Sequence, residues 1–269
     1  FSVTGGGWAE IIGGSGLDQI ALHNTTTKSQ LSILTARDLQ TSIGDIIVGS
    51  LTDANGLKGI SGKTTDLRGN ITVYGGLGTL ALDDIADGHT ITIGRFTGSA
   101  VGTFMTFDCV NNLAINSEMP IKMITATEWH SGSIDVPSVG SITVKGDKRR
   151  SIAGDLDDVD LTVSQLPDAR IPALGKLTVA GSITSCQILS EGNIGAVSAG
   201  AVVNSNCFAG VADGVSGLPD PDEEPPRRPG GDHRRDRPFG VRRDARPAHR
   251  RDRRDPGGTD RKGARDDPA

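Results

Sequence analysis

A short pattern of apolar positions recurs along this chain: an apolar residue, two free positions, an apolar residue, one free position and a last apolar residue. Six of the nine copies carry Gly in second place. The copies begin at Ile43, Leu57, Leu77, Val101, Ile121, Val139, Leu156, Leu174 and Ile194. A period near 20 residues with short apolar strands predicts a repeat architecture in which each unit stacks on the next.

The alternation inside each copy predicts strands. In the copy that begins at Leu77, a period of two places Leu80 and Leu82 on one side of the strand and Ala81 on the other. We expect the second-place Gly to mark a bend at the corner of a coil, where the backbone needs conformational freedom.

A second series of apolar triplets runs between the copies. Its members are 71–73, 91–93, 113–115 and 134–136. Two series in phase imply at least two parallel sheets, each receiving one short strand per coil. The sequence therefore predicts an all-β fold, a parallel β-helix (β-solenoid) of about nine coils with a period near 20 residues. Gly, Thr, Ser and β-branched residues argue against helices. An antiparallel sandwich is the main rival, and the in-phase recurrence of one motif favours the solenoid.

The chain divides into three predicted regions. Residues 1–40 form an N-terminal β cap with a loose hairpin that joins the strands 20–23 and 31–34, since terminal coils expose an edge that needs protection. Residues 41–217 form the solenoid. Residues 218–269 are rich in Arg, Asp and Pro and have few large apolar residues, so we expect a disordered tail.

Composition and charge argue against several classes of function for this chain. Aromatic residues make up 3% of the chain, which suits a narrow core of aliphatic columns. Residues 1–217 carry a net charge of −8 and residues 218–269 a net charge of +3. The acidic body argues against a nucleic-acid partner. Three cysteines imply no disulfide framework, and no apolar run reaches the roughly 18 residues of a membrane span.

One segment matches a calcium-binding pattern. Residues 13–21 read Gly-Gly-Ser-Gly-Leu-Asp-Gln-Ile-Ala, the nine-residue unit in which Gly permits a tight turn and the carboxylate, here Asp18, ligates calcium. The next nine residues do not repeat the unit, and a Gly-rich turn before a strand explains these residues equally well. Asp18 is the candidate calcium ligand, and no other cofactor is expected.

Two acidic groups offer other chemistry. One comprises Asp83, Asp84 and Asp87, and the other Asp155, Asp157, Asp158 and Asp160. Paired carboxylates on a β-helix can hydrolyse glycosides or bind calcium. The alternative is that these carboxylates lie in solvated turns and have no specific role. Trp8 and Trp129 are candidate sugar-stacking surfaces, with packed caps as the simpler interpretation.

Segments such as "GLGTLALDDIADGHTITIG", "VGSITVKGD" and "LGKLTVAGSITSCQILSEGNIGAVSAG" resemble the β-strand repeats of very large bacterial surface and secreted proteins with adhesin-like regions. The resemblance covers residues 1–215. It implies a non-catalytic extracellular segment that spaces or adheres, secreted or at the bacterial cell surface. Surface glycans, envelope proteins and neighbouring domains of a longer chain are the implied partners. A carbohydrate-active β-helix enzyme and a calcium-dependent binding module are the alternatives.

Overall fold

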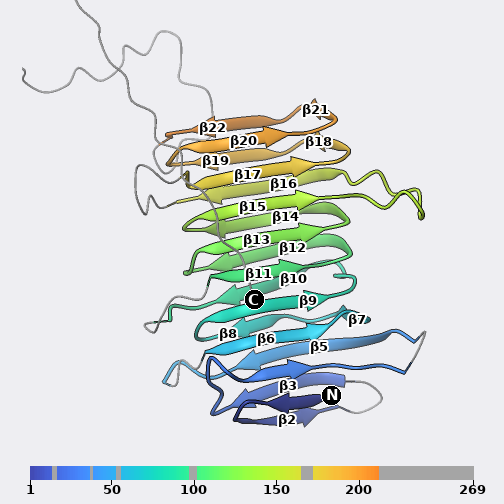
Figure 1. Ribbon diagram of the computed structural model, residues 1–269, viewed down its shortest axis with the longest axis vertical. Helices are drawn as coiled ribbons and strands as arrows, with labels where there is room; N and C mark the ends of the chain where they lie inside the picture. The colour runs from blue at the N-terminus through green and yellow to red at the C-terminus, as the bar shows by residue number, and fades with distance from the viewer. Residues whose placement is uncertain (14–16, 37–38, 53–55, 97–101, 165–171, 212–269) are drawn as a thin grey trace, which may run out of the picture. The chain divides into compact units, whose positions relative to one another are not determined.

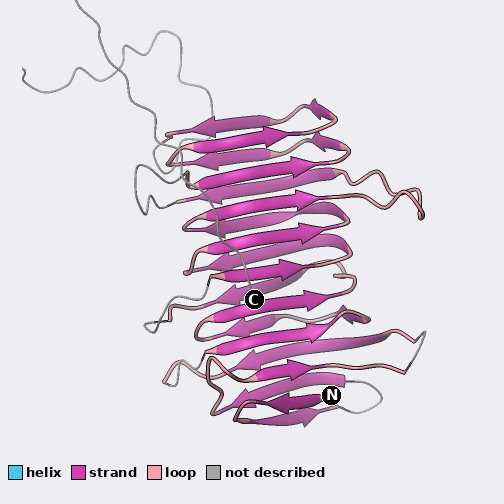
Figure 2. Ribbon diagram, viewed as in Figure 1, coloured by secondary structure: helices cyan, strands magenta, loops and turns pink. Residues whose placement is uncertain are grey.

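The structure is a computed structural model that describes residues 1–13, 17–36, 39–52, 56–96, 102–164 and 172–211. The chain divides into two units, 1–217 and 218–269, and the described residues all belong to the first. The tail predicted to be disordered therefore lies outside the described residues. Every regular element of the described residues is a β-strand (Figure 2). The all-β prediction is confirmed for that part of the chain.

The strands form two sheets, and the chain alternates between them (Figure 1). Sheet A has, in spatial order, β1 (Ser2–Thr4), β4 (Gln30–Ser32), β6 (Leu57–Gly62), β9 (Leu77–Leu82), β11 (Thr103–Thr106), β13 (Ile121–Ala126), β15 (Val139–Val144), β17 (Leu174–Val179) and β20 (Ile194–Ser198). Sheet B has β2 (Trp8–Ile12), β3 (Leu17–His23), β5 (Thr41–Val48), β7 (Thr65–Leu67), β8 (Ile71–Val73), β10 (His89–Ile93), β12 (Cys109–Ser117), β14 (Glu128–Val136), β16 (Leu156–Val163), β18 (Ser182–Thr184), β19 (Gln187–Ser190), β21 (Ala201–Val203) and β22 (Asn206–Ala209).

Strand pairing in both sheets is parallel from β3 and β4 onward. Among the described strands only β1 with β4 and β2 with β3 pair in antiparallel fashion. In Figure 1 the parallel strands of each sheet point the same way. One strand of sheet A with the following strand or strands of sheet B is called a rung below. Long parallel sheets that receive one strand per rung are compatible with the predicted β-helix.

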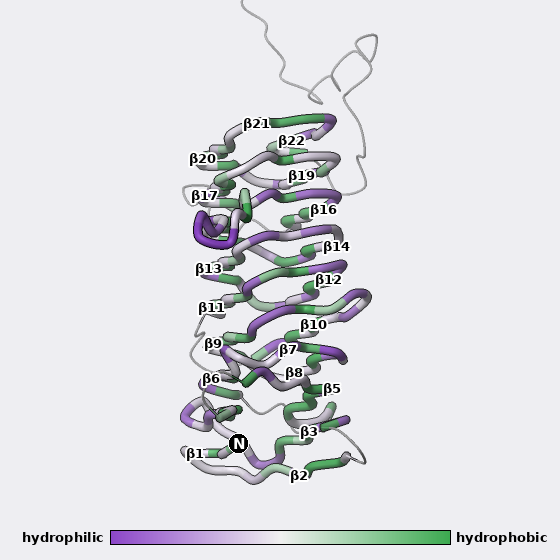
Figure 3. The backbone as a smooth tube through the Cα atoms, turned by 90° about the vertical axis from the view of Figure 1, so that its right-hand side faces the viewer, coloured by the Kyte–Doolittle hydropathy of each residue, from purple (hydrophilic) through white to green (hydrophobic). Residues whose placement is uncertain are grey.

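Apolar side chains of successive rungs pile into columns between the sheets. In sheet A the paired positions are Leu31, Ile60, Leu80, Met105, Ile124, Ile142, Leu177 and Val197. In sheet B they are Ile20, Ile46, Ile71, Ile91, Ile115, Ile134, Leu161 and Ile188. All but Val197 are buried in one hydrophobic core. Figure 3 shows hydrophobic residues alternating with hydrophilic ones along the strands.

The prediction that each series of strands belongs to one sheet is wrong for the recurring motif, whose copies lie in both sheets. The copies that begin at Ile43 and Leu156 lie in β5 and β16 of sheet B, and the other copies with described strands lie in sheet A. This explains the short interval from Ile43 to Leu57. The second series also needs one correction, because Ile91 pairs with Ile115 and not with Leu113.

A column of left-handed residues bends sheet B in successive rungs. Its members, aligned by the strand register, are Gly88, Asn112, Ser131, Asp158, Ser185 and Asn204, with φ between 41° and 77°. Asn, Asp and Gly tolerate this conformation best. The bend divides the sheet B part of each of these rungs into a short strand segment before the bend and a longer one after it.

The second-place glycines have a different role from the one predicted. None of the described ones has a positive φ. At Gly140 an added Cβ would overlap the Lys122 carbonyl oxygen, and at Gly175 it would overlap that of Gly140. Gly195 meets Gly175 in the same way. Glycine is present because consecutive rungs approach closely there, and not because the chain bends freely.

The N-terminal hairpin also differs from the prediction. The segments 20–23 and 31–34 do not pair, since β3 belongs to sheet B and β4 to sheet A. The hairpin joins β2 to β3 instead, with Ile11 opposite Ile20. One edge of β3 pairs in parallel with β5, and one edge of β4 pairs in parallel with β6. The opposite edges of β3 and β4 pair in antiparallel fashion with β2 and β1.

Replacing Ile142 with Ala tests whether the columns stabilise the stack. Ile142 is 2% exposed and lies between Ile124 and Leu177. We expect the free energy of unfolding to fall by about 3 kcal/mol, because the truncation leaves a cavity. Urea denaturation followed by circular dichroism measures the loss. Thr143→Ala, on the outward face of the same strand, should lower it by less than about 1 kcal/mol, and equal losses would contradict the column arrangement.

Candidate functional site

Acidic residues gather at the corner where each rung passes from sheet A to sheet B. Parallel bridges there join Leu67, Ile85, Val110, Trp129 and Leu156 in one buried column. The residue before each of these forms a second column at the surface of the corner. This corner column consists of Asp66, Asp84, Cys109, Glu128 and Asp155. It recurs because the register places equivalent residues of successive rungs beside one another.

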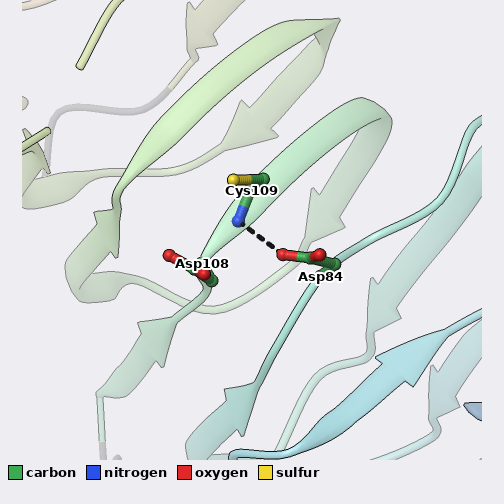
Figure 4. Close-up of side chains that lie close together, drawn as sticks. All are labelled: Asp84, Asp108 and Cys109. Carbon is green, nitrogen blue, oxygen red and sulfur yellow. Dashed lines mark hydrogen bonds between the residues drawn. The ribbon is translucent and has the colours of Figure 1, made fainter. Parts of the chain in front are cut away.

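Several carboxylates of the corner column accept hydrogen bonds from the next rung. The backbone N–H of Cys109 donates to Oδ1 of Asp84 over 3.0 Å (Figure 4). Oδ1 of Asp155 accepts the Ser182 N–H at 2.6 Å and the Ser182 hydroxyl at 2.8 Å. The bond from the Ser182 backbone, followed by the bond from its hydroxyl, holds the pKa of Asp155 below its ordinary value. The side chains thus serve as acceptors where the sheet ladder is interrupted.

Asp84, Asp108 and Cys109 form the tightest group of possible metal ligands among the described residues. Their ligand atoms all lie within 4.8 Å of one another, and all three residues are half-buried. Figure 4 shows Asp108 and Cys109 consecutive on one rung and Asp84 on the neighbouring one. Asp83 directly precedes Asp84 on that rung. Its carbonyl oxygen accepts the Asp108 N–H, which holds the two rungs together at this point.

The positive charge at this corner belongs to Arg150, which lies on a hairpin from a later rung. The hairpin runs between β15 and β16, extends beside the stack in Figure 1 and is closed by two hydrogen bonds between the backbones of Asp147 and Ile152. Arg150 donates from both terminal nitrogens to the two carboxylate oxygens of Asp108 and from Nε to Asp147 at 2.9 Å. These bonds lower the pKa of Asp108.

At two other carboxyls of the corner, Asp66 and Asp83, burial outweighs the groups that favour ionisation, which for Asp66 include the charge of Arg68. Burial, with the charge of Asp84 next, raises the pKa of Asp66. Burial also raises the pKa of Asp83, against a hydrogen bond from Gln40, and the charges of Asp84, Asp108 and Asp66 add to the rise. Ionisation of these two groups is therefore less favourable in the folded chain than in the unfolded one.

Cys109 is not a reactive thiol. Burial, together with the charges of Asp108 and Asp84, raises its pKa to about 11. The thiolate is the nucleophilic and metal-binding form of Cys, and it is scarce at neutral pH with such a pKa. The group therefore offers two carboxylates, and Arg150 already occupies one of them.

The structure separates the predicted acidic groups. Asp83 and Asp84 meet at the corner, whereas Asp87 is exposed and takes no part in the ligand group. Asp155 belongs to the corner column. The other members of the second group lie along β16, where Asp158 occupies the left-handed bend with φ 53°.

Asp18 lies exposed in β3 beside an open groove of about 340 Å³. The groove is also lined by Asp45 and Arg68, and the Asp45 carboxylate accepts the Asn70 N–H at 2.7 Å. Residues 14–16 of the calcium pattern are outside the described residues. Within the described part Asp18 belongs to no group of three metal ligands, and calcium binding there stays a prediction.

The two tryptophans have different environments. Trp129 is fully buried, meets Phe107 edge to face at 6.3 Å and donates from Nε1 to the Ser131 carbonyl. It is a core residue, as the simpler interpretation held. Trp8 is 51% exposed and stacks on His23 with ring centroids 4.2 Å apart.

Sequence reasoning missed Asp66, Asp108 and Arg150. A signal for the first was present: an acidic residue directly precedes the first buried residue of several rungs in sheet B. No comparable signal existed for Arg150, because its partner Asp108 lies 42 residues earlier. The rung of β13 and β14 lies between Asp108 and the hairpin that carries Arg150.

No family model, no curated protein and no solved structure matches this chain. The site is therefore interpreted from its own geometry. No helix of the described residues has the length and hydropathy of a membrane span.

Asp83→Asn tests the electrostatics of the corner. A raised pKa means that the ionised Asp83 lowers stability at neutral pH and that this penalty disappears as the carboxyl is protonated. We expect Asp83→Asn to raise the free energy of unfolding at pH 7 by about 0.5 kcal/mol. The gain should fade as the pH approaches the ordinary value of 3.8.

Denaturation at several pH values measures this difference between the variant and the parent. Asp87→Asn is the matched control, because Asp87 is exposed and outside the group, and it should change nothing. A loss of stability in Asp83→Asn at pH 7 would show that the carboxylate is a net stabilising group.

Proposed function

We propose that residues 1–211 form a β-solenoid that acts as a non-catalytic structural or adhesive segment of a larger extracellular surface protein. The observation that carries the proposal is the alignment of the apolar columns through the rungs of both sheets, which continues past one register shift at Thr103 and Phe104 in sheet A. Such a stack gains stability from contacts between neighbouring rungs, so its core lengthens with each rung that is added. That property suits a spacer that holds a binding surface at a distance.

The corner supports a structural role more than a catalytic one. General acid and base catalysis needs carboxyls that are free to face a substrate. Asp84 is engaged by the backbone of Cys109 and Asp108 by Arg150. The aromatic residues nearest to them along the rungs, Phe107 and Trp129, are buried and offer no stacking surface to a sugar.

The proposal predicts that the purified chain hydrolyses no polysaccharide. Release of reducing ends from neutral and acidic glycans measures this. The chain is expected to equal a buffer blank at all substrates. Hydrolysis that is lost in both Asp84→Asn and Asp108→Asn, while Asp87→Asn retains it, would overturn the proposal in favour of a carbohydrate-active enzyme.

Brief proteolysis of intact cells that produce the native protein tests its location, since only a surface segment is released.

The proposal also predicts that millimolar calcium leaves the melting temperature unchanged. Calcium prefers six to eight oxygen ligands, and the group of Asp84, Asp108 and Cys109 offers two carboxylates with Arg150 on one of them. A ligand of the native state must raise stability by mass action. Thermal melts with calcium and with a chelator measure this. A calcium-dependent rise that Asp18→Asn removes would establish the predicted site, and one that Asp84→Asn removes would place it at the corner.

A further inference from the structure

The last rung leaves the hydrophobic core uncovered at the C-terminal end of both sheets. Val197 of β20 continues the column of Leu177, and Val202 of β21 continues that of Ile183. The two earlier residues are at most 1% exposed, whereas Val197 is 41% and Val202 60% exposed. The inward-facing side chains of this rung are thus built like core residues and are not covered.

The backbone of the same rung is also unpaired on one side. Among the described strands, β20 pairs only with β17, β21 only with β18 and β22 only with β19. Each strand therefore presents a row of N–H and C=O groups at its free edge, which is a template for another strand.

These edge strands are short, but they carry no side chain that would prevent pairing. Proteins protect free edges with charged side chains or proline, and β20, β21 and β22 contain neither. The opposite end differs, because β2 carries Glu10 and Trp8 stacks on His23. We call the surface formed by β20, β21 and β22 the terminal face.

The sequence that follows is poor in the large apolar residues that a further rung would bury. Residues 212–269 contain four large apolar residues, Val215, Leu218, Phe239 and Val241. By contrast, the rung of β17 to β19 buries Leu174, Leu177, Val179, Ile183, Cys186 and Ile188. A segment of mainly Arg, Asp, Pro and Gly has too little apolar surface to replace such a rung.

We propose that the terminal face binds the terminal face of a second copy of this chain. Two identical faces have the same separation between their sheets and the same columns, so they are self-complementary. A two-fold axis perpendicular to the direction of stacking places each edge strand antiparallel to one of the other copy, which the backbone groups accommodate. Such an isologous contact closes at a dimer. This inference goes beyond the proposed spacer function, which does not require it.

Val202→Lys and Val203→Lys test the proposal as a matched pair. They are neighbours on β21, but Val202 aligns with buried Ile183 and Val203 with Thr184 on the outward face. Analytical ultracentrifugation of the full chain over a range of micromolar concentrations gives the dissociation constant. We expect the parent and Val203→Lys to dimerise, and Val202→Lys to dimerise at least about tenfold more weakly because a buried unpaired charge is costly.

Val197→Lys is the second variant and should weaken the dimer in the same way. Both inward positions are exposed in the monomer, so circular dichroism is expected to show unchanged strand content. A parent chain that stays monomeric would overturn the proposal. Equal effects of Val202→Lys and Val203→Lys would also overturn it. Concentration-dependent growth beyond a dimer, which Ile11→Lys in β2 abolishes, would replace it with a head-to-tail contact.

Discussion

The whole stack depends on one constraint: parallel rungs pair in register, so each inward side chain lies on its equivalent in the next rung. A slip of one residue would turn the inward set outward, and the columns of Leu and Ile make such a slip unfavourable. A few buried polar residues interrupt the columns, and one of them is Ser117, which lies beside Ile93. Its hydroxyl exchanges hydrogen bonds with the backbone of Met119, so it is buried without an unpaired polar group.

The same constraint explains much of the acidic corner. Where the chain leaves one sheet for the other, the ladder of backbone hydrogen bonds is interrupted, and short acceptor side chains replace it. Asp84 and Asp155 do so at the corner, and Asp45 and Asn70 do so farther along the rung by accepting the N–H groups of Asn70 and Thr90. Carboxylates placed for this purpose in successive rungs come close together. Arg150 offsets one charge, while burial and like charges disfavour ionisation of others.

Part of the candidate site was predictable. Asp83 and Asp84 are adjacent in sequence and follow a strand, so their placement at a corner follows from local pattern. Asp108 and Arg150 could not be found this way, because their contact depends on the number of residues between rungs and on a hairpin that leaves the repeat. The predicted partner Asp87 is absent from the group for a different reason: Ile85 is buried in the column with Leu67 and Val110, and Asp87, two residues later, is exposed.

The sequence by itself determined the class of the fold, the inward residues of most strands and the approximate period, because alternation and strand length are local properties. Only the tertiary structure decided which copies of the motif belong to which sheet, that the second-place glycines relieve contacts between rungs, and that β2 and not β4 pairs with β3. These features depend on which residues of one rung lie above those of another. Insertions between strands change that alignment without altering the local pattern, so the pattern alone does not contain it.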